Sequence, residues 1–165
     1  MKTIKLILLG LACITALSAT AQSRNKSRSE KKAHIERAVK ESIDLKQYKI
    51  NVNHMQPMSG RSRALTSNYS IEVRNDSVFS YLPYFGVSYS APYGGGKGLI
   101  FNAPISEYKT EQHKKGKVVI DFSTRNEEDN YKYNLTFYPN GSASIHVQPT
   151  KKQPISFTGE MDIKE

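Results

Sequence analysis

A run of tyrosines beside a glycine-rich stretch is the part of this sequence best suited to binding a ligand. The run Tyr81-Leu82-Pro83-Tyr84-Phe85-Gly86 leads into Tyr89, Tyr93 and the stretch Gly94–Gly98. Aromatic faces that carry hydroxyl groups suit sugars, peptides and other ligands of mixed polarity. We therefore predict a ligand-binding surface formed by Tyr81, Tyr84, Phe85, Tyr89 and Tyr93.

The same segment also has a purely structural interpretation. Pro83 can end a strand, and Leu82 and Phe85 can belong to the core. Gly86 can occupy a backbone position that is closed to any side chain. Both interpretations stay open at the level of the sequence.

The sequence offers little support for a metal, a cofactor or a phosphate loop. A phosphate loop requires glycine at position 91 and serine or threonine at position 98, but this chain has Ala91 and Gly98 there. None of the four histidines pairs with another at metal-ligand spacing: His34, His54, His113 and His146. The run Glu127-Glu128-Asp129-Asn130 lacks the alternating spacing of a calcium loop and fits a hairpin tip equally well. We predict no metal and no cofactor.

Catalytic motifs are also missing from the sequence. It contains no Gly-x-Ser-x-Gly nucleophile elbow. The single cysteine, Cys13, precedes the expected mature chain, which therefore has no thiol nucleophile and no disulfide. We predict no catalytic residues. Acids or histidines brought together only by folding leave a small hydrolase open as an alternative.

The first 22 residues have the pattern of a secretory signal peptide. Lys2 and Lys5 precede a mostly apolar stretch over residues 6–17, and Ala19-Thr20-Ala21 forms a cleavage site before Gln22. The apolar stretch is too short for a stable membrane span. We expect residues 1–21 to be removed, which leaves a periplasmic or secreted chain without a transmembrane segment.

Cys13 raises an alternative, because bacterial lipoproteins retain an acylated cysteine at their cleavage site. Ala12 fits the residue that precedes such a cysteine. Gly10, however, stands where a leucine-like residue is usual. Cleavage after Ala21 is the favoured interpretation.

Basic residues are concentrated near the expected mature N-terminus. The chain has a formal net charge of +9, and five of its cations lie between residues 24 and 32. We predict a flexible basic arm over residues 22–28. Attraction to phosphate-rich lipid or acidic polymers is an alternative role for this charge. No nucleic-acid partner is expected, because no nucleic-acid-binding motif is present.

The hydrophobic pattern predicts one helix. Ser29 is a candidate N-cap, and apolar residues recur at helical spacing at Ile35, Ala38, Val39 and Ile43. The helix should end near Leu45. Its apolar stripe is narrow.

After the helix, the period of the pattern changes to two, which predicts antiparallel strands with one buried face. Tight turns are predicted at Asn75-Asp76 and Pro139-Asn140-Gly141, and long loops at residues 59–67 and 90–98. The alternating segments are 48–53, 69–74, 77–81, 118–123, 131–138, 143–148 and 155–161.

The helix stripe is too narrow to cover a whole apolar sheet face, so the sheet must curve onto itself. We predict a mostly β, α+β fold with about eight antiparallel strands, barrel-like or sandwich-like, and one N-terminal helix. A single β-rich domain should span residues 29–165.

Several short motifs resemble a known family. They are Gln56-Pro57-Met58-x-Gly60, Leu65-Thr66, Asp76-Ser77-Val78 and Tyr81-Leu82-Pro83-Tyr84-Phe85-Gly86. This pattern resembles a family of exported Bacteroidetes proteins of unknown function with a Leu-Pro-Tyr-Phe-Gly signature. The likeness runs from about Ala33 to the C-terminus. It implies an envelope or secreted domain with no assigned activity and no catalytic residues to transfer.

Asp76-Ser77-Val78 also resembles the acceptor for protein O-glycosylation in Bacteroidetes, so Ser77 is a candidate modification site. It follows a predicted turn, where a modifying enzyme has access, although a plain turn explains the motif as well.

The preferred function is a secreted or periplasmic, non-catalytic binding or envelope-associated domain of unknown ligand. Its partner would be an envelope ligand or protein. The alternatives are the small hydrolase and a protein-partner or inhibitor module that uses a sheet edge.

Overall fold

The computed structural model describes residues 28–90 and 98–163. The chain divides into two compact units, residues 1–34 and residues 35–165. The described part of the first unit, residues 28–34, is helical. The expected signal peptide, most of the basic arm and Tyr93 lie outside the described residues.

The predicted helix spans residues 28–44, which confirms its expected end near Leu45. Its predicted start is wrong, because Arg28 and Ser29 are already helical. Ser29 is therefore not an N-cap, and the predicted basic arm over residues 22–28 stays a prediction because residues 22–27 lie outside the described residues. Charged residues around Ser29 are compatible with a helix, so the polar composition there did not reveal the extension.

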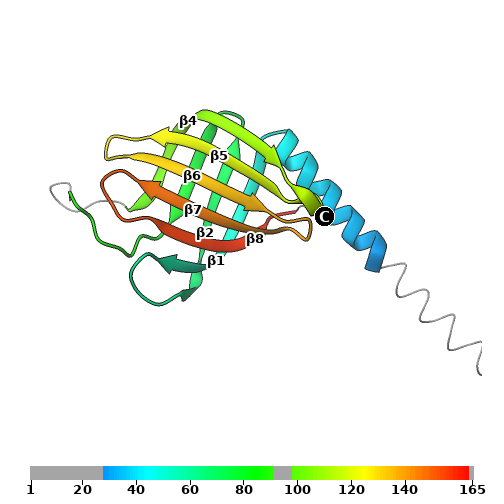
Figure 1. Cartoon of the computed structure of the whole chain (residues 1–165), viewed down its shortest axis with the longest axis horizontal. Coiled ribbons are helices and arrows are strands. Elements are labelled where there is room, and N and C mark those ends of the chain that lie inside the picture. The colour runs from blue at the N-terminus through cyan, green and yellow to red at the C-terminus, as the bar shows by residue number, and fades with distance from the viewer. Residues whose placement is uncertain (1–27, 91–97, 164–165) are drawn as a thin grey trace, which may run out of the picture. The chain divides into compact units, whose positions relative to one another are not determined.

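Eight antiparallel strands form a closed barrel in the described part of the chain (Figure 1). Each strand pairs with the next along the chain, and β8 pairs with β1 to close the sheet. The strands are β1 (Gln47–Pro57), β2 (Arg63–Arg74), β3 (Ser77–Leu82), β4 (Leu99–Gln112), β5 (Val118–Arg125), β6 (Asn130–Phe137), β7 (Ser142–Pro149) and β8 (Ile155–Met161), with a short 3₁₀ helix η1 (Lys114–Gly116) before β5. The predicted curved, mostly β fold with one helix is confirmed.

The every-other-residue pattern positions the strands as expected. In β6 the apolar side chains of Tyr131, Tyr133 and Leu135 are buried, whereas Lys132 between them is exposed. The predicted turn at Asn75-Asp76 joins β2 to β3, with Asn75 in the left-handed region at φ 54°. Asparagine tolerates this backbone conformation better than most residues.

One strand was missed and one predicted loop is wrong. β4 was not predicted, because Leu99-Ile100-Phe101 does not alternate and Pro104 interrupts the run. The predicted loop over residues 59–67 is shorter, since β2 already begins at Arg63. The first half of β2 is polar and contains a bulge. Val52 of β1 pairs with Tyr69 of β2, whereas His54, two residues further along β1, pairs with Ala64. A bulge leaves extra residues exposed, so no alternation appears there.

Large inward side chains fill the barrel. The ring of Phe122 stacks on Tyr133 with centroids 4.9 Å apart, and Phe101 stacks on Tyr131 at 4.6 Å. Such ring pairs add to the roughly 25 cal/mol gained for each Å² of apolar surface removed from water. The inward positions are therefore occupied by packed aromatic and aliphatic groups.

Two buried hydroxyls within this core have hydrogen-bond partners. The Tyr133 hydroxyl donates to Ser80 Oγ at 3.3 Å, and the Ser80 hydroxyl donates to the Leu99 carbonyl at 2.6 Å. Buried hydroxyls without partners would cost about 1–3 kcal/mol each. This chain of bonds ties β6 to β3 and β4 through the interior.

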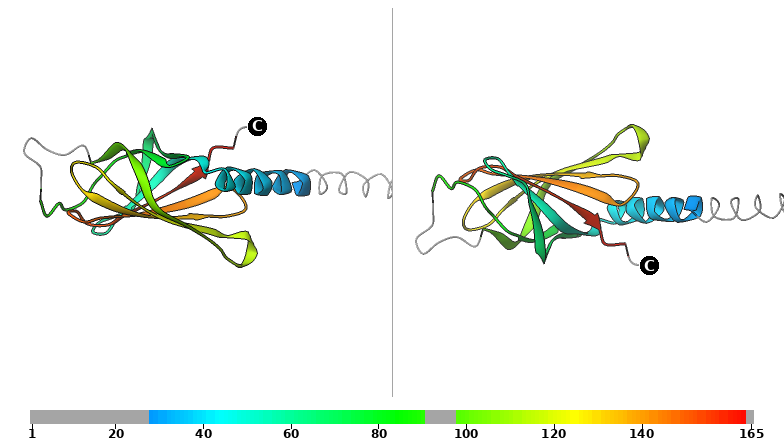
Figure 2. Two further views of the ribbon diagram at one scale, coloured as in Figure 1. Left: turned by 90° about the horizontal axis from the view of Figure 1, so that it is seen from above. Right: turned by 90° about the horizontal axis from the view of Figure 1, so that it is seen from below.

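The two ends of the barrel differ. At one end, Val39 and Ile43 of the helix are buried in the hydrophobic core. The side chain of Ile35 lies 3.6 Å from the position that a Cβ on Gly141 would take, so it lies beside the β6–β7 turn. We call this the covered end. The segments 58–62, 83–90, 126–129 and 150–154 connect strands at the opposite end, which we call the loop end (Figure 2).

The buried tyrosines predict a loss of stability at alkaline pH. Burial raises the pKa of Tyr131 to about 12 and also raises the pKa of Tyr133. An unfolded tyrosine has a pKa of about 10, so the folded state holds these protons more tightly. Their stabilisation is complete below about pH 10 and is lost as the pH rises toward 12.

The unfolding free energy of both proteins is compared at pH 8 and at about pH 11.5. We expect it to fall by about 2 kcal/mol less in Tyr131→Phe than in the wild type. Urea denaturation at each pH measures this difference. Tyr138→Phe changes an exposed tyrosine and should behave like the wild type. Parallel pH profiles for all three proteins would contradict the expectation.

Candidate functional site

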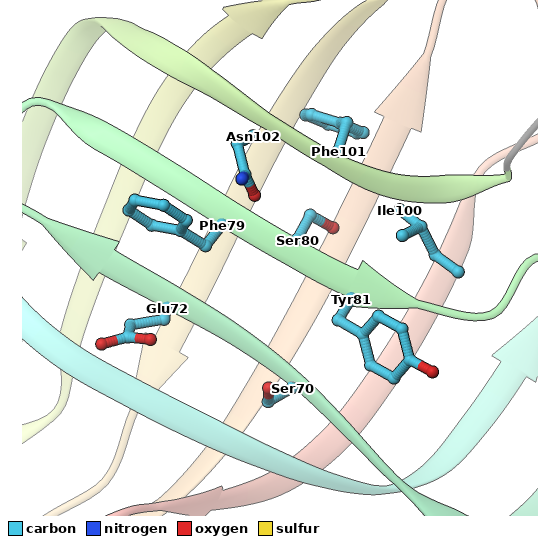
Figure 3. Close-up of a pocket in the computed structure, with 8 residues that line it drawn as sticks. All are labelled: Ser70, Glu72, Phe79, Ser80, Tyr81, Ile100, Phe101 and Asn102. Carbon is cyan, nitrogen blue, oxygen red and sulfur yellow. The ribbon is translucent and has the colours of Figure 1, made fainter.

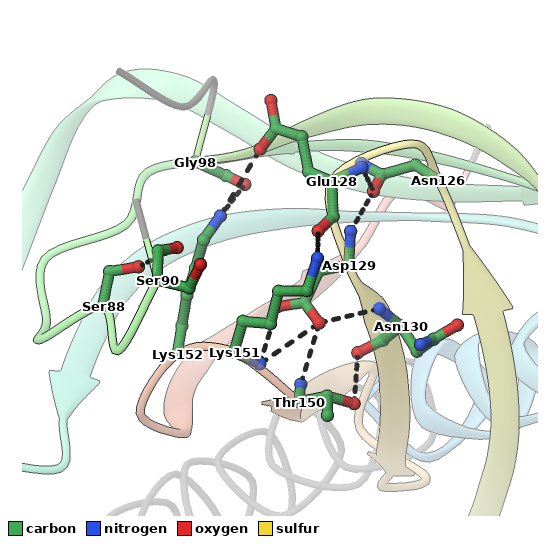
Figure 4. Close-up of polar contacts among 10 residues, drawn as sticks. All are labelled: Ser88, Ser90, Gly98, Asn126, Glu128, Asp129, Asn130, Thr150, Lys151 and Lys152. Atoms are coloured by element: carbon green, nitrogen blue, oxygen red, sulfur yellow. Dashed lines mark hydrogen bonds and ion pairs between the residues drawn. The ribbon is translucent and has the colours of Figure 1, made fainter. Parts of the chain in front are cut away.

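A buried carboxylate organises the loop end. Asp129 is 3% exposed, and its Oδ1 accepts the backbone N–H groups of Asn130 at 2.8 Å and Thr150 at 3.2 Å (Figure 4). Its Oδ2 accepts the N–H of Lys151 at 3.0 Å. One side chain of the β5–β6 loop thereby fixes the backbone of the β7–β8 loop.

A buried lysine links the same loops to the segment after β3. Lys152 is 6% exposed, its Nζ donates to the Gly98 carbonyl at 3.3 Å, and it lies 3.6 Å from Glu128 Oε2. The ammonium also lies 5.7 Å from the centre of the Tyr84 ring. Burying a charge is costly unless it is paired, and these partners provide the compensation.

The segment after β3 is held in place rather than free. The Tyr84 hydroxyl lies 3.0 Å from both the Val87 and the Gln153 carbonyl oxygens, to which it donates. Backbone N–H groups of Tyr89 and Gln153 donate to Lys151 and Val87 carbonyls at 2.8 and 3.0 Å. Burial raises the pKa of Tyr84, so this hydroxyl keeps its proton as a donor at neutral pH.

Gly86 fits its structural interpretation. A Cβ at this position would lie 2.6 Å from the Tyr84 hydroxyl oxygen. Pro83 likewise follows the last residue of β3, and Leu82 is fully buried. Phe85, by contrast, is not a core residue.

Among the described ligand candidates, Tyr81, Phe85 and Tyr89 are exposed and Tyr84 is half-buried, but they do not form one surface. Tyr81 and Phe85 are each 50% exposed, and Tyr89 is 67% exposed. Tyr81 lines a groove of about 250 Å³ on the outer face of β2, β3 and β4, between Ser70 and Ile100 (Figure 3). Tyr84 and Phe85 line a different cavity. The structure thus brings these two residues together and leaves Tyr81 apart.

The cavity that contains Tyr84 and Phe85 is the strongest candidate site, and we call it the loop-end cavity. Its volume is about 420 Å³. The end of β1, the β1–β2 turn, the start of β2 and the segment after β3 contribute its lining: Pro57, Ser59, Gly60, Arg61, Arg63, Tyr84, Phe85 and Gly86.

Two arginines of this cavity were missed by the sequence analysis. Arg61 and Arg63 lie in the stretch that was predicted as loop, where cations are ordinarily solvated. In the structure, the Arg63 guanidinium carbon lies 5.5 Å from the centre of the Phe85 ring. A pair of arginines two residues apart, directly after a turn glycine, was the signal that could have identified them.

The outer-face groove has a different character. The Arg74 guanidinium bonds both carboxylate oxygens of Glu72, at 2.6 and 2.8 Å, and lies 4.7 Å from the Phe79 ring centre. The carboxylate of Glu72, which lines this groove, is therefore already paired with Arg74. Ser77 lies beside this groove, directly after the β2–β3 turn, and is half-buried; its modification stays a prediction.

Within residues 28–90 and 98–163, no three His, Cys, Asp or Glu side chains are grouped so that they could hold a metal ion. His146 is exposed and lies 2.9 Å from Ser156 Oγ. Two of the three acids of the predicted hairpin tip, Glu128 and Asp129, contact protein groups instead, whereas Glu127 is exposed. Over the same part of the chain, no helix is both long and apolar enough to cross a membrane.

Fold and site together define a closed antiparallel barrel with a basic, aromatic cavity at its loop end. Residues 30–161 match the family described as "Domain of unknown function (DUF4251)", and the chain belongs to that family. This confirms the expected kind of family, one of unknown function, although the Leu-Pro-Tyr-Phe-Gly signature itself stays a prediction. A comparison with curated proteins gave no match.

A solved structure shares the fold. It is the crystal structure of a DUF4251 family protein from Bacteroides eggerthii DSM 20697, with a TM-score of 0.64 and 20% sequence identity. The similarity covers 78% of this chain and 87% of that chain. At this identity the likeness concerns the fold.

We expect Asp129→Ala to loosen the loop end. Removing the carboxylate leaves the buried N–H groups of Asn130, Thr150 and Lys151 without their acceptor, at a cost of about 2–4 kcal/mol in unfolding free energy. Hydrogen exchange should accelerate at residues 150–153 and 87–89. Asp121→Ala removes an exposed acid of β5 and serves as the control. Unchanged exchange at the loop end in the Asp129 variant would contradict this role.

Proposed function

We propose that the chain is an exported, non-catalytic binding domain whose ligand occupies the loop-end cavity. The observation that carries this proposal is the half-exposed Phe85 ring beside Tyr84 in a cavity of about 420 Å³. Small-molecule sites in proteins have volumes of about 300–1,000 Å³ and combine aromatic walls with a few polar groups.

The anchoring of the cavity wall supports a binding role. Tyr84 is fixed through its hydroxyl and through Lys152, and Phe85 is the next residue. A wall that is ordered before the ligand arrives costs less conformational entropy on binding.

The lining of the cavity favours binding over hydrolysis. It contains no Asp, Glu or His among the described residues. General acid–base chemistry requires such groups within hydrogen-bond reach of the substrate. The small-hydrolase alternative therefore gains no support from this site.

The sheet-edge alternative also has less support. Closure between β1 and β8 removes the two outer edges of the sheet. β4 pairs with β3 only from Leu99 to Pro104, but beyond that point its exposed residues include Glu107, Lys109 and Glu111. Charged side chains are a common means of protecting such a stretch from pairing.

We infer a periplasmic or secreted localisation from the sequence of residues 1–21. Intact mass of the protein from the envelope or medium of its native host should correspond to a chain that begins at Gln22. A full-length protein in the cytosol, or a lipidated N-terminus at Cys13, would contradict this processing.

We keep Ser77 as a proposed glycosylation site, and an added mass that Ser77→Ala removes would support it.

The binding proposal predicts that Phe85 is required for ligand retention. The mature chain is incubated with a panel of neutral and acidic oligosaccharides and short peptides, and complexes are measured by native mass spectrometry. We expect at least one complex, weakened about tenfold or more by Phe85→Ala because an aromatic contact is lost. Tyr138→Ala removes an exposed aromatic at the opposite end and should have no effect. No complex, or equal loss in both variants, would count against the proposal.

A further inference from the structure

We propose that the loop-end cavity selects a sugar that carries an oxyanion, either a carboxylate or a phosphate, with Arg61 and Arg63 as the residues that bind the anionic group. This inference rests on the proposed binding function and specifies the chemical class of the ligand.

The first argument is the absence of local neutralisation. Both arginine side chains belong to exposed residues that line the cavity. Within the described residues, neither forms an ion pair with an acid. The cavity lining there includes no carboxylate. An anion that enters the cavity therefore meets two guanidinium groups without competing with an acid of the described residues.

The second argument concerns the acids at the same end of the barrel. Asp129 accepts backbone N–H groups and is buried, and Glu128 lies 3.6 Å from the buried Lys152. These two carboxylates are committed to the loop structure, and the third acid of this loop, Glu127, is exposed and does not line the cavity. Rotating either toward the arginines would leave buried donors or a buried cation without compensation, at a cost of several kcal/mol.

The third argument is the position of Lys152 behind the cavity wall. Tyr84 lines the cavity and also lies 5.7 Å from the Lys152 ammonium. Lys152 thus holds this wall in place, while its own charge is balanced by its partner Glu128. The positive charge of the cavity therefore comes from the two arginines that line it.

The geometry of the arginines and the aromatic ring favours a sugar over a simple ion. Arg63 lies 5.5 Å from the Phe85 ring centre, so a cation and a flat apolar face are presented together. Guanidinium groups bind carboxylate and phosphate oxygens through paired N–H bonds. An aromatic ring contacts the apolar face of a ring-shaped ligand. A sugar with one anionic group matches both features.

Gly60 leaves additional room at the cavity. No atom lies within 4 Å of the position that a Cβ on this residue would take, and its φ of +126° strains any other residue type. Backbone that lacks a side chain can approach a ligand closely. The Gly60 carbonyl also accepts a bond from Gln56 Nε2 at 3.4 Å, which orients the turn.

Titration of the ¹⁵N-labelled mature chain with four probes tests this inference. The probes are digalacturonate, galactose 6-phosphate, and the neutral sugars galactobiose and galactose. We expect the amide signals of Gly60, Arg61, Arg63 and Gly86 to shift with the acidic probes. At least one acidic probe should bind tenfold or more tightly than its neutral counterpart, and the relative affinity of the two acidic probes identifies the anionic group.

Arginine variants provide the decisive comparison. The double variant Arg61→Gln/Arg63→Gln should lose the preference for the acidic probe, and raising the salt from about 50 to 500 mM should weaken binding to the wild type. Arg125→Gln removes an exposed arginine at the same end that does not line the cavity, and should leave binding unchanged. Unchanged thermal midpoints would show that all variants remain folded.

The outcomes separate the two proposals. Equal binding of acidic and neutral sugars, abolished by Phe85→Ala but unaffected in the double arginine variant, would overturn the anion inference and leave the binding function intact. Shifts confined to residues outside the cavity, or no shifts with any of the probes, would overturn the inference. Binding to anionic lipid vesicles that requires Arg61 and Arg63, without binding to either acidic sugar, would replace the sugar with a membrane surface and so overturn it too.

Discussion

Pairing between the first and last strands is the constraint on which the barrel depends. β1 and β8 pair from Ile50 opposite Met161 to Pro57 opposite Ile155, and this contact alone joins the ends of the sheet. Gly159 makes the contact possible, because a Cβ there would lie 2.9 Å from the Val52 Cα. A side chain at residue 159 would push the strands apart at the bulge in β1. Closure also satisfies the backbone groups that an open sheet would expose.

Closure determines where a ligand can bind. The inward positions carry large side chains such as Phe122, Tyr131 and Tyr133, which stack on one another, so the interior serves as a core. The helix residues Val39 and Ile43 occupy the covered end. Binding groups therefore have to come from the loop end or from the outer face. The loop end places two arginines without an acid partner among the described residues beside the exposed ring of Phe85.

The sequence predicted the fold far better than it predicted the site. Alternation identified seven strands, because a half-buried strand repeats its pattern every two residues regardless of partners. β4 was missed where both Ile100 and Phe101 lie in an apolar run, and the β2 bulge was taken for loop because its residues face solvent. Tyr84 and Phe85 lie at one cavity, and their role in ligand binding stays a prediction. Arg61 and Arg63 were not predicted there, since their proximity to Phe85 arises only when the β1–β2 turn folds over the segment after β3.

The allocation of charge at the loop end links stability to recognition. A basic chain must place its few acids where they contribute most, and here Asp129 and Glu128 support the loops through buried contacts. Acids used in this way are unavailable to neutralise surface cations. The arginines of the turn consequently retain their capacity for an external anion, while Lys152, fixed by Glu128, positions the Tyr84 wall against which that ligand would rest. The same loop contacts that close the barrel end thus produce a cavity with a net positive lining.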